Sequence, residues 1–327
     1  MKALRIITIA LASVGLATAD TITLRPTAAG ERPYRVEGEV LDWRGEGVKF
    51  SVGRSSSRLY PADRVVDVQT TWPEGVAEAK TAIQRRLWQA AADSLPAAER
   101  KEKRPWARRQ IAIRRLECLL ALGQWKRAGD LLIAIDSQDR TTRAWRLAPL
   151  PWFASDAISM PDASSWLARR EESARLLGAA WLLFSPRSSQ AVGELRSLAR
   201  SRHAAIATLA ETQLWRRDLT RADRRQTDRW ARRLQSVPPH LAAGPRHILA
   251  QAYRRQKRYD DAALAALEGP LTGAAPHRLA ARGLLLASRS LQAAGQDEES
   301  RVLLAELTRD YADTPQADSL QARPAKP

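Results

Sequence analysis

The residues of this sequence best suited to catalysis or metal binding are four histidines and one cysteine. His203, His240, His247 and His277 lie too far apart in the chain to form a local metal-binding motif. The sequence contains no HExxH, paired CxxC, GxSxG or Walker-type glycine-rich motif. Cys118 lies in an apolar run, which predicts a buried small hydrophobic side chain. We therefore predict that the protein is not an enzyme and has no metal site and no cofactor.

Eleven tryptophans are an unusual number for a chain of 327 residues. Interleaved with arginines, they could form stacking platforms for nucleic acid or sugars. Five of them lie in apolar helical stripes or at hairpin turns, where packing in a core is the favoured interpretation: Trp88, Trp125, Trp166, Trp181 and Trp215.

Residues 1–19 have the layout of a secretory signal peptide. Lys2 and Arg5 precede an apolar stretch from Ile6 to Leu16, and Ala17 to Ala19 form an A-x-A cleavage site before Asp20. An uncleaved N-terminal anchor is the alternative. No later stretch is apolar enough to span a bilayer, so we expect no membrane span after signal cleavage. The predicted location is exported, either periplasmic or associated with the cell envelope.

The charge of the chain is strongly positive. Lys and Arg total 53 against 36 Asp and Glu, a formal net charge of +17, and only eight of the basic residues are lysine. An arginine-rich composition is also what a high-GC genome produces, and solvated helix faces accept arginine easily. The excess over acids nevertheless favours an acidic protein or peptide, or an anionic envelope lipid or polymer, as partner. Export argues against nucleic acid.

The pattern of side chains divides the chain into a short β part and a long helical part. Apolar and charged residues alternate from Tyr34 to Val40 and again from Val48 to Val52, which predicts four or five strands in residues 20–72. So many short strands suggest a small SH3-like or Sm-like β-barrel.

Residues 73–315 are predicted to be helical, and residues 316–327 a disordered tail. The first helix is expected to begin at Trp72 and to continue through Leu87 and Trp88 to about Asp93. Prolines punctuate residues 136–164, which we interpret as an ordered connection or short helices.

Three helical hairpins align on the turn between their helices. The matching positions are Gly123, Trp125, Ala128 and Leu132 in the first; Ala250, Tyr253, Lys257, Tyr259 and Ala262 in the second; and Ser288, Leu291, Gly295, Ser300 and Leu304, with Tyr311 and Pro315 closing, in the third. Small residues suit the points where the two helices cross closely. The hairpins resemble the tetratricopeptide (TPR) family, and the whole layout is similar to exported TPR proteins of planctomycete-type bacteria. Lys257 in place of glycine and Leu116 at a small position depart from the family pattern, and a generic helical bundle is the alternative.

The resemblance implies an α-solenoid of divergent TPR-like hairpins whose first helices line a concave groove. His247, Gln251 and Arg254 follow one another at i, i+4 and i+7 on one such helix. Arg282, Arg289 and Gln292 occupy the equivalent face of the next. These six residues are our predicted binding groove, basic and suited to an acidic peptide or a terminal carboxylate. The plain alternative is that they are ordinary solvated side chains.

The sequence therefore predicts an exported, non-enzymatic protein–protein interaction scaffold of the bacterial cell envelope. It is mostly α, with a small SH3/Sm-like β-barrel domain before the solenoid. The alternative function is a basic envelope protein that binds anionic lipid or polymer by diffuse electrostatics.

Overall fold

The computed structural model describes residues 19–27, 32–53, 56–153 and 156–321, and the chain divides into two compact units, Met1–Trp72 and Pro73–Pro327. Apart from Ala19, the predicted signal peptide lies outside the described residues, as do residues 322–327. No helix within the described ranges is long and apolar enough to cross a membrane.

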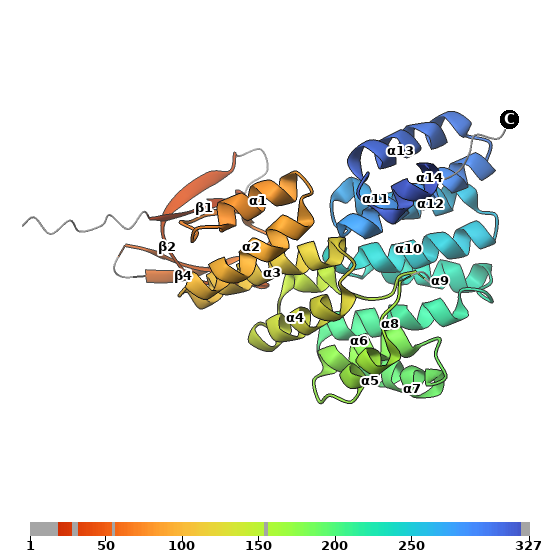
Figure 1. Cartoon of the computed structure of the whole chain (residues 1–327), viewed down its shortest axis with the longest axis horizontal. Helices are drawn as coiled ribbons and strands as arrows, with labels where there is room; N and C mark the ends of the chain where they lie inside the picture. Colours follow the sequence, from red (N-terminus) through yellow and green to blue (C-terminus); the bar gives the residue numbers. More distant parts are fainter. Residues whose placement is uncertain (1–18, 28–31, 54–55, 154–155, 322–327) are drawn as a thin grey trace, which may run out of the picture. The chain divides into compact units, whose positions relative to one another are not determined.

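The first unit is a five-stranded antiparallel sheet with the order β4-β3-β2-β1-β5 (Figure 1). Its strands are β1 (Asp20–Leu24), β2 (Tyr34–Arg44), β3 (Gly47–Val52), β4 (Ser56–Pro61) and β5 (Val65–Gln69). β2 is long enough to pair with β1 through its first half and with β3 through its second half, and its register shifts between Val40 and Asp42. Ile22, Phe50 and Val48 are completely buried and form the apolar side of this sheet.

The predicted closed barrel is not formed by the described strands. β4 and β5 are the two edges of the sheet, and they do not pair with each other. Only Tyr60 is buried in β4, whose other residues are exposed and mostly polar. Closing the sheet through β4 would therefore bury little apolar area, and the expected gain from closure is small.

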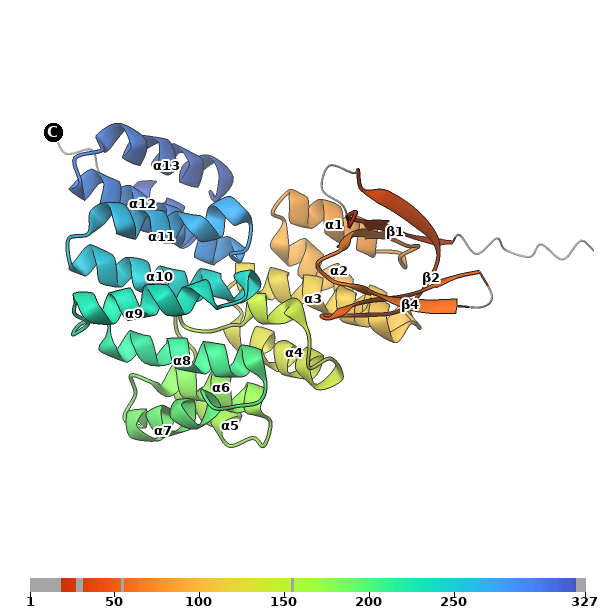
Figure 2. The same cartoon turned by 180° about the vertical axis from the view of Figure 1, so that it is seen from behind.

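The second unit is helical, and within the described ranges it holds fourteen α-helices and one 3₁₀ helix. From α8 to α13, successive helices lie stacked in roughly the same orientation (Figures 1 and 2). Helix α12 contacts α10, but it also contacts α3, so the packing is not limited to neighbours along the chain. The helices are α1 (Val76–Gln84), α2 (Trp88–Lys101), α3 (Pro105–Ala121), α4 (Trp125–Gln138), η1 (Arg143–Leu147), α5 (Met160–Leu167), α6 (Glu172–Leu182), α7 (Ser188–Leu198), α8 (Ala204–Asp218), α9 (Arg224–Gln235), α10 (Pro239–Arg255), α11 (Tyr259–Thr272), α12 (His277–Ala293), α13 (Asp297–Asp310) and α14 (Pro315–Gln321).

Four pairs of consecutive helices share one tight turn: α1–α2, α3–α4, α10–α11 and α12–α13. The turn residue has positive φ in each, 60° at Arg86, 71° at Gly123, 60° at Lys257 and 82° at Gly295. Its N–H donates to the carbonyl three residues back, and the following N–H donates to the carbonyl five residues back. This is the helix C-terminal geometry that favours glycine because a Cβ is strained at positive φ.

The first of these turns corrects the prediction of one continuous helix from Trp72 to about Asp93. The chain turns at Arg86 and Leu87, so the segment forms α1 and α2 instead. Arginine gives no sequence signal of a left-handed residue, so the sequence pattern does not predict a turn here.

The core of the helical unit confirms the predicted roles of the cysteine and the tryptophans. Cys118 is completely buried, and burial raises the pKa of its thiol to about 12. Trp88, Trp166 and Trp215 are buried, while Trp125 and Trp181 pack against the core from its margin.

The predicted disordered tail differs from the structure at its start, because residues 315–321 form α14. Thr314 is almost fully buried beneath this helix, its side-chain oxygen donates to the carbonyl of Tyr311, and Ala317 is buried as well. These buried contacts explain why the chain remains helical here. They depend on residues of α12 and α13 and leave no local pattern in the sequence.

Candidate functional site

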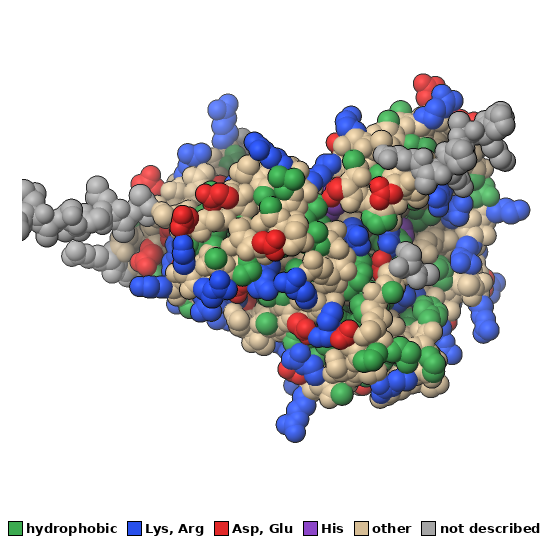
Figure 3. All heavy atoms as spheres, viewed as in Figure 1, with side chains coloured by type: hydrophobic (Ala, Val, Ile, Leu, Met, Phe, Trp, Pro, Cys, Tyr) green, Lys and Arg blue, Asp and Glu red, His purple; other side chains and the backbone are tan. Residues whose placement is uncertain are grey.

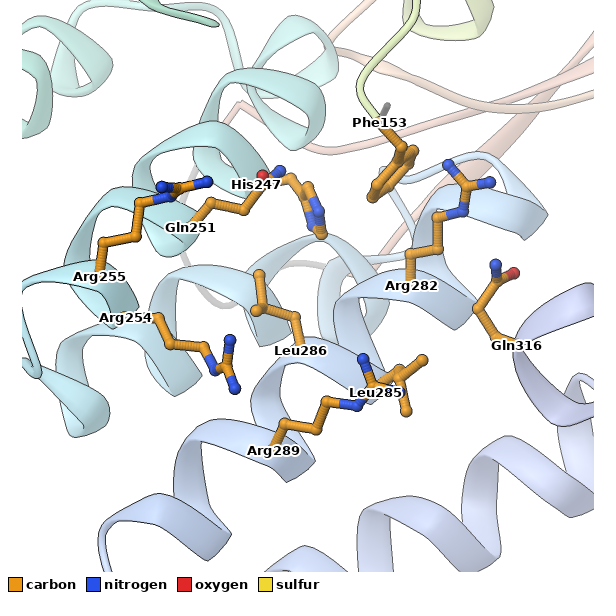
Figure 4. A pocket seen from close by; sticks show the side chains of 10 residues that line it. All are labelled: Phe153, His247, Gln251, Arg254, Arg255, Arg282, Leu285, Leu286, Arg289 and Gln316. Atoms are coloured by element: carbon orange, nitrogen blue, oxygen red, sulfur yellow. The ribbon is translucent and has the colours of Figure 1, made fainter. Parts of the chain in front are cut away.

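Five of the six predicted groove residues line one pocket of about 340 Å³ (Figure 4). The pocket lies between α10 and α12, and α14 and the segment before α5 complete its wall. Its lining residues are Phe153, His247, Gln251, Arg254, Arg255, Arg282, Leu285, Leu286, Arg289 and Gln316. The sixth predicted residue, Gln292, is exposed further along α12 and does not line the pocket.

The residues meet because α10 and α12 place them on facing sides. Seven residues are close to two turns of an α-helix, so His247 and Arg254 lie on one face of α10, and Arg282 and Arg289 on one face of α12. In Figure 4 the His247 side chain lies toward Arg282, and Arg254 toward Arg289. We call the His247–Arg282 end the closed half and the Arg254–Arg289 end the open half.

The closed half is filled by the chain's own connecting segment, residues 148–153 and 156–159. The ring of Phe153 packs edge-on against the His247 ring with 4.4 Å between centroids, and the Arg282 guanidinium lies 3.6 Å above the Phe153 ring centre. Arg282 Nη2 also donates to Asp156 Oδ1 at 2.8 Å. The side chains of this ion pair are only 10% and 4% exposed.

His247 is a neutral side chain at the pocket wall, so it adds no charge to the groove that the sequence predicts to be basic. It is buried, and burial together with the nearby charge of Arg282 lowers its pKa to about 3. Its Nδ1 has no hydrogen-bond partner among the described residues.

The charge of the pocket therefore comes from its open half. Arg254 and Arg255 are exposed and form no ion pair with any described residue. Arg289 is exposed as well; in Figure 4 the Arg254 side chain extends toward the side of the pocket where Arg289 lies, and the guanidinium of Arg289 lies beside Leu285. No Asp or Glu is among the described residues that line the pocket. Leu285 and Leu286 supply an apolar surface beside these cations.

Five lining residues come from outside the predicted face or outside the predicted helices. Phe153 lies about one hundred residues before the helices that it contacts, and Gln316 falls in the segment expected to be disordered. Leu285 and Leu286 lie on α12 at the helical spacing that is also typical of buried core leucines, so the sequence pattern does not mark them as pocket residues. Arg255 follows Arg254 directly and is the one member that a basic Arg–Arg pair could have indicated.

A second pocket, of about 460 Å³, lies at the start of α8 and α10. It is also basic, but Arg140 is already paired with Asp136 and Glu172. His203 likewise contacts Asp136. The first pocket is the one that gathers five of the six predicted residues, and no described Asp or Glu lines it.

No protein-family model, curated protein or solved structure matches the chain. No group of three His, Cys, Asp or Glu side chains in the described ranges could hold a metal ion. Guanidinium groups around an apolar surface can bind an anionic group that carries an apolar neighbour.

Proposed function

We propose that the protein is an exported interaction scaffold of the cell envelope whose helical unit binds an acidic segment of a partner protein. One observation carries this proposal: Arg254, Arg255 and Arg289 surround a pocket that no described carboxylate lines. Guanidinium groups bind carboxylates through charge-assisted, often bidentate hydrogen bonds. The groove is a binding surface and performs no reaction.

The four equivalent turns support a solenoid of divergent TPR-like hairpins. Three of them coincide with the hairpins aligned in the sequence, and the fourth, at Arg86, extends the series toward the N-terminus. Lys257 and Arg86 keep the backbone geometry of the turn without its usual glycine. This is the divergence expected if sequence identity is lost while the hairpin is retained.

Export and location in the envelope rest on the N-terminal sequence pattern. The alternative function, diffuse binding of anionic lipid or polymer, is favoured by the distribution of charge. On the face shown in Figure 3, Lys and Arg side chains are spread widely with Asp and Glu among them, and they do not gather in one patch.

Matched charge reversals test the proposal. The chain without the predicted signal peptide, residues 20–327, is compared as wild type, as Arg254→Glu with Arg289→Glu, and as Arg232→Glu with Arg301→Glu. Arg232 and Arg301 are exposed arginines away from the pocket, so both variants change the net charge equally. Binding of acidic peptides and of phosphatidylglycerol vesicles is measured at increasing salt.

We expect peptide binding that the pocket variant loses and the control variant keeps. Equal weakening of both variants, with vesicle binding that declines smoothly with salt, would instead support the diffuse electrostatic function, because exposed charges are screened by salt wherever they lie.

A further inference from the structure

The closed half of the pocket shows how these two helices bind a peptide segment, because the chain's own connecting segment occupies it. Gln251 Nε2 donates to the carbonyl of Trp152 at 3.5 Å, which is a long contact with the main chain. The ring of Phe153 lies between His247 and Arg282. The carboxylate of Asp156 accepts from Arg282. One guanidinium therefore contacts both an aromatic ring and the acid three residues after it.

The open half repeats the positions of the closed half two turns further along each helix. Arg289 follows Arg282 by seven residues, and Arg254 follows His247 by seven. This spacing corresponds to a shift of about 10 Å along the helix axes. Leu285 and Leu286 lie between the two arginines of α12 and provide the apolar surface against which a ring can pack.

We propose that the open half binds a partner segment of the same chemistry as the connecting segment: an aromatic residue followed, three positions later, by an acidic residue. Arg289 contacts the ring and the carboxylate of the partner, as Arg282 does for Phe153 and Asp156. Arg254 supplies a second guanidinium to the carboxylate. This inference rests on the proposed function and adds the kind of segment that the site selects.

The apolar part of the site distinguishes such a segment from a simple polyanion. A phosphate or an acidic polymer could satisfy the arginines, but it would leave Leu285 and Leu286 in contact with water. An aromatic side chain covers this surface and also gains a cation–π interaction with the guanidinium.

The connecting segment itself supplies the test peptide. A fluorescein-labelled peptide with the sequence of residues 151–158 is titrated with the chain of residues 20–327, and fluorescence anisotropy is measured. Matched peptides carry Phe153→Ala or Asp156→Asn, and an acidic peptide of equal charge without aromatic residues serves as reference. The protein variants are Arg254→Gln with Arg289→Gln, and Arg232→Gln with Arg301→Gln as the control of equal charge.

We expect each altered peptide to bind at least tenfold more weakly than the parent, the pocket variant to lose the parent peptide, and the control variant to keep it. If the reference peptide binds the pocket as tightly as the parent, the aromatic requirement is wrong while the proposed function stands. If peptide binding is lost with Arg282→Gln but unchanged in the pocket variant, the peptide has replaced the connecting segment and the inference is overturned. If no acidic peptide binds at all, the proposed function fails as well.

Discussion

The indole Nε1 of Trp88 donates a hydrogen bond to the carboxylate of Asp313, 225 residues further along the chain. The same carboxylate accepts from His277 Nε2 at 2.8 Å if that nitrogen carries the proton. The His277 ring stacks on Tyr311, with 4.9 Å between centroids. The start of α2 is thereby joined to the start of α12 and to the turn before α14. Together with the packing of α12 on α3, this cluster ties the first helices of the unit to the last.

Loss of the Trp88 hydrogen bond is expected to weaken this connection. Trp88→Phe keeps the aromatic ring and removes the donor to a charged acceptor, so the free energy of unfolding should fall by about 1.5–3 kcal/mol. Urea unfolding of Trp88→Phe, Asp313→Asn and the double variant measures the coupling between the two residues. Strictly additive effects would show that the hydrogen bond contributes nothing to stability.

Removing one partner of the Asp156–Arg282 ion pair should lower the free energy of unfolding, while replacing both partners by apolar residues should lower it much less. Both side chains are nearly buried, so Asp156→Asn leaves a guanidinium without its carboxylate and should destabilise the helical unit by about 3 kcal/mol. Replacing both, Asp156→Leu with Arg282→Met, should recover most of this loss. Thermal unfolding of the three variants tests the prediction, which an Asp156→Asn protein as stable as wild type would contradict.

His247 should make the protein less stable in acid. Its pKa is about 3 when folded and 6.5 ordinarily, so between these values the unfolded chain binds the proton more readily. The free energy of unfolding should therefore fall as the pH drops below 6.5, by roughly 2–3 kcal/mol at pH 4.5.

The variant His247→Gln removes this titration and keeps a polar side chain. Its unfolding free energy, measured in urea from pH 7.5 to pH 4.5, should fall less steeply than that of the wild type. His277 also has a lowered pKa, caused first by burial, but it is present in both proteins and cancels in the comparison. Parallel curves for the two proteins would show that His247 is not held neutral.

The shared turn predicts opposite effects of two substitutions. Gly295 has φ of 82° and open space around the position of a Cβ, so Gly295→Ala should destabilise by about 1 kcal/mol through backbone strain alone. Lys257 already bears this strain, and Lys257→Gly should stabilise by up to about 1 kcal/mol. Chemical denaturation of both variants gives the two values, and a destabilising Lys257→Gly would contradict the strain argument.

Gly123→Ala provides a stricter version of the same test. Besides positive φ, an added Cβ there would lie 2.5 Å from Arg278 Nη1. The loss of stability should exceed that of Gly295→Ala, unless the Arg278 side chain moves aside.

The local patterns of the sequence determined the type of each region and the faces of its helices. Period-two alternation identified the β part, and the spacing from His247 to Arg254 and from Arg282 to Arg289 placed those residues on common faces. Local backbone preference and burial of an apolar face act over a few residues, so a linear pattern records them. The pocket lined by five of the six predicted residues follows from this periodicity.

Only the tertiary structure decided what those residues face. Phe153 and Asp156 contact Arg282 although more than one hundred residues separate them in the chain. As a result Arg282, predicted as an open groove cation, is nearly buried and its charge is balanced by Asp156. Burial against the same segment makes His247 neutral, and the packing of α14 brings Gln316 to the pocket. Desolvation and ion pairing depend on which distant segments are in contact. The periodicity of a helix defines its face, but the charge that this face presents is set by what packs against it.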